Sequence, residues 1–492
     1  MPPRFRPWQE CVVYTVWPRS FADGNGDGIG DLPGLTERLD ELRWLGVDAL
    51  WLAPIHPSPN ADYGYDVSDY LDVHPDFGTM ADFRTLRDEL HRRGMRLLLD
   101  LVINHTSVRH PWFLASRASR TSAKRDWYHW RARPNDWESI FGGPAWTWDE
   151  ATGEYYLHLF FPEQPDLDWS NPAVRQALAE IARFWLDEGV DGFRFDALTV
   201  LKKEEGLPDV TPGEPGGPRP AWSRFLARPG LLDWVRDFAE RAGITRDHLT
   251  LGEANGIAAT DAPAWVGEPQ GPLSALLHFE LWHIDTTDAQ GRPGLDTRAF
   301  SDTARSWYRA LAPHGALPAL YLENHDLPRI VSRWAPPERR AQAAKAFAAA
   351  TYLQRGLAVL YQGQELGLPN ARFTRSSDLR DPLSLRRIAA LRAQGMSDAA
   401  ILAEMNRSAR DLSRTPIPWD ANRPQAGFSS AEPWQPMDPA HIPLAWRQQR
   451  EDEDSVLNFY RAILAERHTK RQELLPAGLT TSVPIARQST TQ

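Results

Sequence analysis

Apolar, strand-like runs alternate with helix-like segments along most of this chain. Leucine or alanine recurs between several of the runs at the helical spacing of three to four residues, as at 35–45 and 338–353. Eight such alternations predict a TIM-type (β/α)8 barrel, an α/β fold with a parallel sheet. The expected strands are residues 12–16, 49–52, 96–103, 192–195, 249–252, 276–279, 317–322 and 357–361.

Two long segments interrupt this alternation. Residues 105–170 follow the third strand and are rich in aromatic residues and proline, and the helix start signal Asn171-Pro172 ends the interruption. Residues 364–445 are polar and too long for an ordinary loop. The predicted parts are a barrel at 1–104 and 171–363, an inserted domain at 105–170, an insertion at 364–445 after the eighth strand, the last barrel helix at 446–468 and a polar tail at 469–492.

Charge and composition limit the partners that we expect. The net charge of −10 argues against nucleic acid, whose binding depends on clustered cations. The single cysteine, Cys11, excludes an internal disulfide, and the chain has neither a signal-peptide-like start nor an apolar run of about 20 residues. We predict a cytoplasmic protein with a small neutral substrate, no nucleic-acid or membrane partner and no organic cofactor, and leave its oligomeric state open.

Three carboxylates follow strand-like runs that lie far apart in the sequence. Asp196 comes after the fourth run, Glu253 after the fifth and Asp326 after the seventh. The carboxyl ends of parallel barrel strands meet at one face, so these side chains are expected to share a pocket. Hydrolysis of a glycosidic bond needs one carboxyl as acid and another as nucleophile or base. The pattern therefore predicts a glycoside hydrolase.

The sequence suggests different tasks for these carboxylates. Arg194 lies two residues before Asp196, so both side chains point to the same face of the strand. This cation would keep Asp196 ionised, as a nucleophile requires, although an ordinary structural ion pair is the alternative. Glu253 would be the proton donor, which needs a pKa raised toward the working pH.

Further candidates for binding a sugar lie beside these strands. Asp62 and Tyr65 belong to a short loop after the second strand, where a carboxylate can accept hydroxyl hydrogen bonds and a ring can stack on a sugar. A solvated surface turn is the alternative. His105 and His325 follow the third and seventh strands, and a neutral imidazole can donate to a sugar oxygen.

A loop near the N-terminus has the spacing of an EF-hand-like metal site. Oxygen-bearing side chains occupy loop positions one, three, five and nine, and glycine occupies position six. Position twelve is Gly34 instead of glutamate, so we predict a structural Ca²⁺ site, with Mg²⁺ or a metal-free Asx turn as alternatives. The predicted ligands are Asp23, Asn25, Asp27, Ile29 and Asp31.

Several short segments resemble the signature segments of the α-amylase family of glycoside hydrolases, and within it the α-glucosidase and oligo-1,6-glucosidase group. The matching segments occur in the family's order at 100–105, 192–197, 251–254 and 323–326. Residues 164–168 resemble a fifth segment, with Asp168 where asparagine is usual. Four or five ordered motifs over roughly the first 460 residues are far more specific than one motif.

The resemblance implies a role for each site residue. Asp196 would be the nucleophile, Glu253 the acid/base, and Asp326 the third carboxylate, which stabilises the transition state. The resemblance also implies a retaining mechanism with transglycosylation as a side reaction. Asp62 and Arg414 would close the pocket so that only a chain end enters. The residues expected around the terminal glucose are Asp62, Tyr65, His105, Arg194, His325 and Arg414.

The resemblance also bears on the substrate and on the C-terminus. In the group, a small residue after the nucleophile accompanies α-1,4 cleavage, and Ala197 is small. This favours maltose and short malto-oligosaccharides, with isomaltose cleavage or a trehalose- or sucrose-isomerising activity as alternatives. The three retained acids argue against the non-catalytic, transporter-associated relatives. Too few residues follow 468 for the family's C-terminal β-sandwich, which takes on the order of 100 residues, so we expect that domain to be largely absent.

Overall fold

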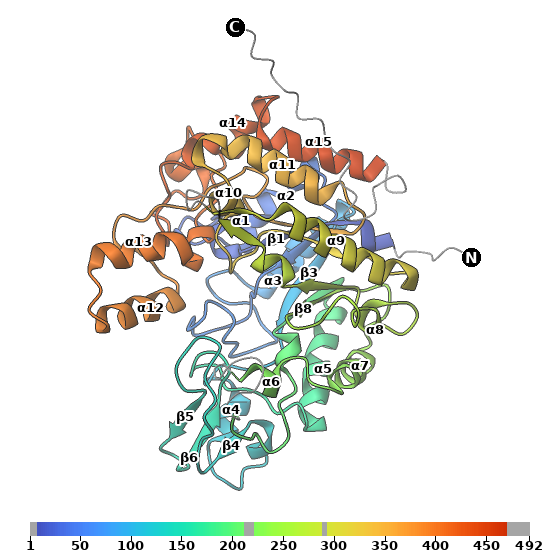
Figure 1. Ribbon diagram of the computed structural model, residues 1–492, viewed down its shortest axis with the longest axis vertical. Coiled ribbons are helices and arrows are strands. Elements are labelled where there is room, and N and C mark those ends of the chain that lie inside the picture. The colour runs from blue at the N-terminus through green and yellow to red at the C-terminus, as the bar shows by residue number, and fades with distance from the viewer. Residues whose placement is uncertain (1–6, 211–220, 288–292, 470–492) are drawn as a thin grey trace.

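The computed structural model describes residues 7–210, 221–287 and 293–469. Within these residues, eight parallel strands form one sheet in the order β12-β13-β1-β2-β3-β7-β8-β9 (Figure 1). The predicted (β/α)8 barrel is thereby confirmed. The strands are β1 Val12–Val16, β2 Ala49–Leu52, β3 Arg96–Val102, β7 Gly192–Asp196, β8 Leu249–Ala254, β9 Ala275–His278, β12 Ala319–Leu320 and β13 Leu357–Tyr361.

A tyrosine side chain joins the two end strands of this sheet. Tyr321, directly after β12, donates its hydroxyl to the carbonyl of His278 in β9 at 2.5 Å. The predicted seventh strand, 317–322, is therefore wrong in length. Only Ala319 and Leu320 pair with β13, because the chain then leaves the ladder and places Tyr321 against the neighbouring strand.

Alternate residues of the strands face two different apolar clusters. Val13 and Leu98 are buried inside the barrel, whereas Val12 and Leu97 are buried against the outer helices. Since both faces of the sheet are covered, the strands read as nearly continuous apolar runs. This burial fixes the strands and hence the positions of the side chains at their carboxyl ends.

The helices that cover the sheet follow the expected order, with one correction. The segment at 35–45, predicted as one helix, is two, because Arg38 leaves helical geometry with φ −102° and ψ 5°. Asn171 caps the helix that it was predicted to start, accepting from the amide of Ala173 at 2.9 Å. The covering helices are α1 Leu32–Glu37, α2 Leu39–Leu45, α3 Met80–Arg92, α5 Pro172–Asp187, α7 Leu231–Ala242, α9 Thr297–Leu311, α11 Arg340–Tyr352 and α15 Val456–Thr469.

The segment predicted as an inserted domain, 105–170, extends to one end of the molecule (Figure 1). It contains helix α4 Pro111–Ser116 and an antiparallel sheet of β4 Trp130–Arg131, β6 Glu154–Leu157 and β5 Trp146–Asp149. The exact limits of this domain stay a prediction. Shorter elements elsewhere are α6 Trp222–Phe225, α8 Pro263–Val266, α10 Ile330–Trp334, and the hairpin of β10 Asp285–Thr287 and β11 Pro293–Leu295.

The second insertion forms two helices that project from the side of the barrel (Figure 1). They are α12 Pro382–Ala393, which we did not predict, and α13 Asp398–Ser408. The range predicted for the last barrel helix, 446–468, contains α15, and the short helix α14 Trp446–Glu451 precedes it. The predicted polar tail lies outside the described residues from 470 onward.

No helix in the described parts of the chain is both long and apolar enough to cross a lipid bilayer. The cytoplasmic location stays a prediction.

A buried ion pair ties the first insertion to the barrel. The ammonium nitrogen of Lys203 lies 2.7 Å from Oδ2 of Asp166 and donates to Oδ1 of Asn104 at 2.8 Å. All three side chains are buried. Lys203 follows β7, Asn104 follows β3 and Asp166 belongs to the insertion, so one cation connects three parts of the fold.

We expect Lys203→Met to lower the free energy of unfolding by about 3 kcal/mol, because it leaves the Asp166 carboxylate buried without its cation. Urea denaturation measures the change. Lys202→Met is the matched control: Lys202 is half-buried beside the Trp234 ring, and its loss should cost about 1 kcal/mol or less. Adding Asp166→Asn to Lys203→Met should recover stability, and equal losses in the two single lysine variants would contradict the role of the ion pair.

Candidate active site

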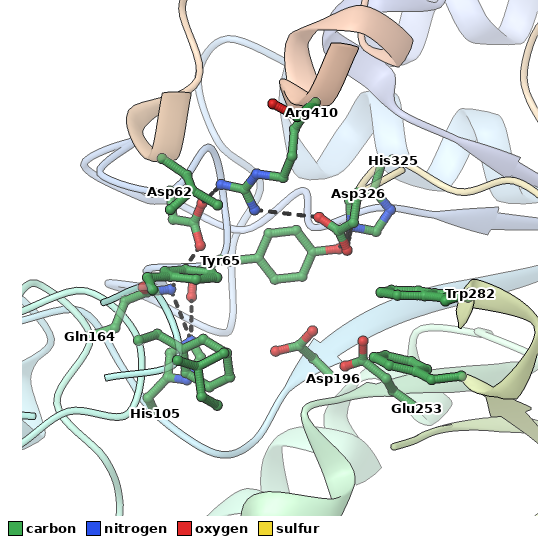
Figure 2. Close-up of a pocket in the computed structure, with 16 residues that line it drawn as sticks. Asp62, Tyr65, His105, Gln164, Asp196, Glu253, Trp282, His325, Asp326 and Arg410 are labelled. Atoms are coloured by element: carbon green, nitrogen blue, oxygen red, sulfur yellow. Dashed lines mark hydrogen bonds and ion pairs between the residues drawn. The ribbon is translucent and has the colours of Figure 1, made fainter. Parts of the chain in front are cut away.

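The predicted acids meet in a pocket at the carboxyl ends of the barrel strands (Figure 2). Asp196 ends β7, Glu253 lies near the end of β8, and Asp326 follows β12. The pocket volume is about 290 Å³, near the lower end of the range for small-molecule sites. Its lining residues are Asp62, Tyr65, His105, Ile140, Phe141, Phe160, Gln164, Asp196, Glu253, Phe279, Trp282, His325, Asp326, Leu383, Ser408 and Arg410.

One buried guanidinium holds two of the three acids. Nη1 of Arg194 lies 2.6 Å from Oδ1 of Asp196, and Nη2 lies 3.1 Å from Oε2 of Glu253. Asp100, in the middle of the neighbouring strand β3, accepts from the same Nη1 at 2.9 Å. Arg194 therefore does not line the pocket but fixes the two carboxylates side by side beneath it.

Burial, not Arg194, has the largest influence on both carboxyl groups. It raises the pKa of Asp196 to about 7, while Arg194 lowers that pKa and Asp100 raises it further. Burial also raises the pKa of Glu253 to about 7, again opposed by Arg194. Arg194 favours the ionised form of Asp196, as predicted, but desolvation outweighs the guanidinium and raises the pKa above its ordinary value. The charge of Asp196 also contributes to the raised pKa of Glu253.

The residue after Asp196 positions Glu253 through its backbone. Ala197 has a left-handed backbone, φ 48° and ψ 33°, which is rare for a residue with a side chain. Its amide donates to Oε2 of Glu253 at 2.7 Å. Its methyl group does not line the pocket but belongs to a buried apolar cluster with Trp137 and Leu159. Any effect of the small size of Ala197 on the linkage stays a prediction.

Asp326 is held by two arginines and a histidine. Its Oδ1 lies 3.0 Å from Arg414 and 3.3 Å from Arg410, and Oδ2 lies 3.3 Å from Nε2 of His325. Burial acts to raise the pKa of Asp326, but these three neighbours hold it well below its ordinary value. Asp326 is therefore an anion across the working pH range.

His325 and Tyr65 form a rigid wall next to Asp326. Their rings are nearly parallel, with centroids 5.4 Å apart, and the Tyr65 hydroxyl lies 2.7 Å from Nε2 of His325. Trp17 stacks on the same histidine at 5.3 Å. Burial lowers the pKa of His325 to about 3, so its imidazole is neutral. The predicted neutral histidine beside an acid is present in the structure, although its sugar-binding role stays a prediction.

The far end of the pocket is closed by an arginine that we did not predict. Asp62 pairs with Arg410, Oδ1 to Nη2 at 2.9 Å, and Oδ2 accepts from Gln164 at 3.2 Å (Figure 2). We predicted Arg414 in this place. Arg414 instead lies behind the wall, where it contacts Asp326 and donates to the carbonyl of His325 at 2.7 Å. The two arginines are four residues apart within the second insertion, so the sequence alone did not separate them.

His105 lies on the opposite wall from Asp326. Its Nε2 is 3.1 Å from the carbonyl of Tyr65 and 3.1 Å from Nε2 of Gln164. Burial lowers the pKa of His105 to about 4, so it too is neutral. Gln164 stands in the fifth signature segment, and that match is the signal that could have identified it as a site residue.

Apolar and aromatic residues of the pocket had no distinct sequence signal. Phe141 and Phe160 come from the first insertion, Leu383 from α12, and Phe279 and Trp282 from the loop after β9. These segments lie outside the signature segments, and aromatic residues are also common in cores. Only the folded chain brings them to the mouth of the barrel.

In the predicted metal loop, backbone amides of the loop itself donate hydrogen bonds to the aspartate carboxylates. Asp23 accepts from the amides of Gly26 and Gly28 at 2.6 and 2.8 Å, and Asp31 accepts from Gly24 and Gly34 at 3.0 and 2.7 Å. Among the described residues, no group of three or more His, Cys, Asp or Glu side chains is arranged to hold a metal ion. This geometry is that of the Asx-turn alternative. The Ca²⁺ ion stays a prediction.

Comparisons with known proteins agree with this geometry. Residues 15–477 match the family model described as the catalytic domain of α-amylase. The probable oligo-1,6-glucosidase 3 of Bacillus subtilis (strain 168) is 42% identical over 469 residues, which cover 94% of this chain and 84% of the relative. The α-glucosidase of Pediococcus pentosaceus is 40% identical over 480 residues, 94% and 84% of the two chains.

A solved structure of the trehalulose synthase MutB, in an inactive form with bound isomaltulose, matches with a TM-score of 0.87. It is 37% identical, and the match covers 95% of this chain and 85% of that one. Relatives of comparable similarity thus have names that state different activities. Similarity alone therefore gives the family and leaves the substrate open. The chain belongs to the α-amylase family of glycoside hydrolases.

Proposed function

We propose that the protein is a retaining, exo-acting α-glucosidase that releases terminal α-linked glucose from short oligosaccharides. The observation that carries the proposal is that Arg194 holds Asp196 and Glu253 together at one side of the pocket. The Asp62–Arg410 pair blocks the opposite side, so a sugar chain can enter by its end but cannot pass through.

In the first step, one oxygen of Asp196 attacks the anomeric carbon while Glu253 protonates the departing glycosidic oxygen. Of the two acids, Asp196 has the shorter contact with Arg194, 2.6 Å against 3.1 Å. This closer cation favours the ionised form of Asp196, and the charge of Asp196 in turn favours the protonated form of Glu253, as the nucleophile and the acid require. The anionic Asp326 stabilises the positive charge that develops on the sugar ring.

In the second step, Glu253, now ionised, removes a proton from water, and the water oxygen attacks the anomeric carbon of the glucosyl–Asp196 ester. The ester bond breaks, and glucose leaves with its original α configuration. A second sugar in the place of water gives transglycosylation by the same route.

The pH dependence of kcat/KM should be bell-shaped with its maximum near pH 7. Glu253 must be protonated, so activity falls as the pH rises above its pKa of about 7. Asp196 must be ionised, so activity falls as the pH drops below its pKa of about 7. Initial rates on maltose from about pH 5 to about pH 9 test this, and a flat profile through neutrality would contradict it.

The preferred linkage is part of the proposal. The small side chain of Ala197 favours maltose over isomaltose by resemblance, and its amide contact with Glu253 gives a route by which this residue affects the acid. The similarity to an oligo-1,6-glucosidase makes isomaltose the second candidate.

Initial rates on maltose, isomaltose, sucrose, trehalose and trehalose 6-phosphate test the function, with the products followed by NMR. We expect α-glucose as the first product and the highest kcat/KM on maltose. Isomerised disaccharides from sucrose, or glucose released first as the β-anomer, would contradict the proposal.

A further inference from the structure

A buried aspartate of the second insertion lies behind the closed end of the pocket. Asp381 directly precedes α12 and is only 1% exposed. It does not line the pocket, and it takes no part in the chemical steps proposed above. Its carboxylate nevertheless contacts both arginines that hold the pocket acids, Arg410 and Arg414.

Both oxygens of Asp381 contact these arginines. Oδ2 accepts from Nη1 of Arg414 at 2.8 Å and lies 3.0 Å from Nη2 of Arg410. Oδ1 accepts from Nε of Arg410 at 3.1 Å, so this guanidinium is held at two of its nitrogens. Such two-point pairing fixes the orientation of a guanidinium as well as its position. Burial acts to raise the pKa of Asp381, but the two arginines hold it below its ordinary value, so Asp381 is an anion.

The other nitrogens of the two arginines point toward the pocket acids. Nη2 of Arg410 lies 2.9 Å from Oδ1 of Asp62, and Nη1 lies 3.3 Å from Oδ1 of Asp326 (Figure 2). Nη2 of Arg414 contacts the same oxygen of Asp326 at 3.0 Å. Arginine loses much rotamer freedom when it is held in one conformation. A buried anion behind both side chains offsets that loss and keeps them directed at the acids.

The same carboxylate also caps helix α12. Oδ1 of Asp381 accepts from the amides of Leu383 and Ser384 at 3.0 and 3.3 Å, and Leu383 lines the pocket. The backbone amide of Asp381 in turn donates to Oδ1 of Asp411 at 2.9 Å. Asp381 is therefore fixed by its own backbone and connects the start of α12 to the two arginines.

We propose that Asp381 is a positioning residue that orients Arg410 and Arg414 and thereby determines how firmly the terminal glucose is bound. The inference rests on the proposed function, in which this glucose occupies the end of the pocket that Arg410 closes. Asp381 acts through the two arginines and does not contact the sugar. The second insertion thus contributes to the glucose site through a buried anion as well as through the residues that line the pocket.

Asp381→Asn removes this anion but keeps the helix cap, because asparagine caps a helix about as well as aspartate. With its carbonyl at the cap, the amide NH₂ faces guanidinium N–H groups, and two donors cannot pair. We expect kcat/KM to fall about 10²-fold on both maltose and α-glucosyl fluoride, since both place a glucosyl unit at the closed end. The inhibition constant of glucose should rise about tenfold, because glucose binds at the same place.

Asp296→Asn is the matched control. Asp296 caps α9 by accepting from the amides of Arg298 and Ala299 at 3.0 and 2.9 Å, and it does not line the pocket. We expect its activity to stay within about twofold of the parent. Urea denaturation of both variants shows that they fold. In Asp381→Asn, the acids Asp62 and Asp326 still face the two arginines, so neither guanidinium is left without a carboxylate.

A double variant separates positioning from a purely structural role. In an Arg410→Met background, adding Asp381→Asn should lower kcat/KM by only about tenfold or less, because one of the two arginines that it orients is already gone. An equal loss in both backgrounds would show that Asp381 does not act through Arg410. That result, parent-like activity of Asp381→Asn, or failure of Asp381→Asn to fold would each overturn the inference.

The unmodified protein distinguishes failure of this inference from failure of the proposed function. If it releases glucose from neither maltose nor isomaltose, the proposed function is wrong. If it releases glucose and Asp381→Asn keeps the same kcat/KM and the same glucose inhibition constant, only the positioning role is wrong.

Discussion

Asp196→Asn is expected to lower kcat on maltose by about 10⁴-fold or more without unfolding the protein. The amide cannot form the glycosyl ester, yet it has nearly the same size and can still accept a hydrogen bond from Arg194 at the end of β7. Because desolvation opposes the charge of Asp196 in the free protein, the neutral amide should not lower stability. Steady-state rates and a urea denaturation curve measure the two effects.

The matched control for this change is Asp233→Asn. Asp233 lies on α7, and its side chain is 77% exposed. We expect the activity of Asp233→Asn to stay within about twofold of the parent, as for most surface substitutions. Turnover of Asp196→Asn at the parent rate would remove the nucleophile from the proposal.

Glu253→Gln is expected to lower kcat/KM on maltose by about 10³-fold, because a sugar leaving group depends on protonation by this residue. Fluoride needs no such assistance, so the loss on α-glucosyl fluoride should be much smaller. The decline of activity above pH 7 should also disappear, since Glu253 is the group whose ionisation causes it. Rates on the two substrates over the same pH range measure all three effects.

Equal losses on maltose and α-glucosyl fluoride would show that Glu253 is not the general acid. The surface variant Glu163→Gln is the control, because Glu163 is 42% exposed and pairs with Arg386 away from Asp196. An unchanged fall in activity above pH 7 in Glu253→Gln would assign that limb of the profile to another group.

The acids could be predicted from the sequence because two local patterns determine their position. A buried apolar strand can be recognised by its residues, and in a parallel barrel the residues at its carboxyl end lie at the common pocket. Asp196 and Glu253 follow from this rule alone. Asp326 follows even though its strand, β12, is much shorter than predicted, since the loop after it still begins at the same face.

The rest of the pocket depends on contacts between segments that local patterns do not encode. Arg410 and Arg414 stand four residues apart in the same insertion, and only the path of the chain decides which one reaches Asp62. Trp282 has no neighbouring motif and is placed by Tyr321 and Arg333.

The pKa of Asp196 is the other property that the spacing of residues in the sequence could not predict. The presence of Arg194 beside Asp196 is visible in the sequence, and it suggested an ionised nucleophile. The pKa, however, depends on how completely the carboxyl is desolvated and on Asp100 in the neighbouring strand. Neither is known before the barrel is assembled.

The central claim is that Asp196 carries the glucosyl unit covalently between two chemical steps. Incubation with 5-fluoro-α-glucosyl fluoride tests it directly, because the ring fluorine slows both steps while the fluoride leaving group lets the first proceed. Mass spectrometry of the digested protein should then show one added fluoroglucosyl group on the peptide that contains Asp196. A label on a peptide with a different carboxylate, or turnover of the reagent to a product of inverted configuration without any label, would contradict the account.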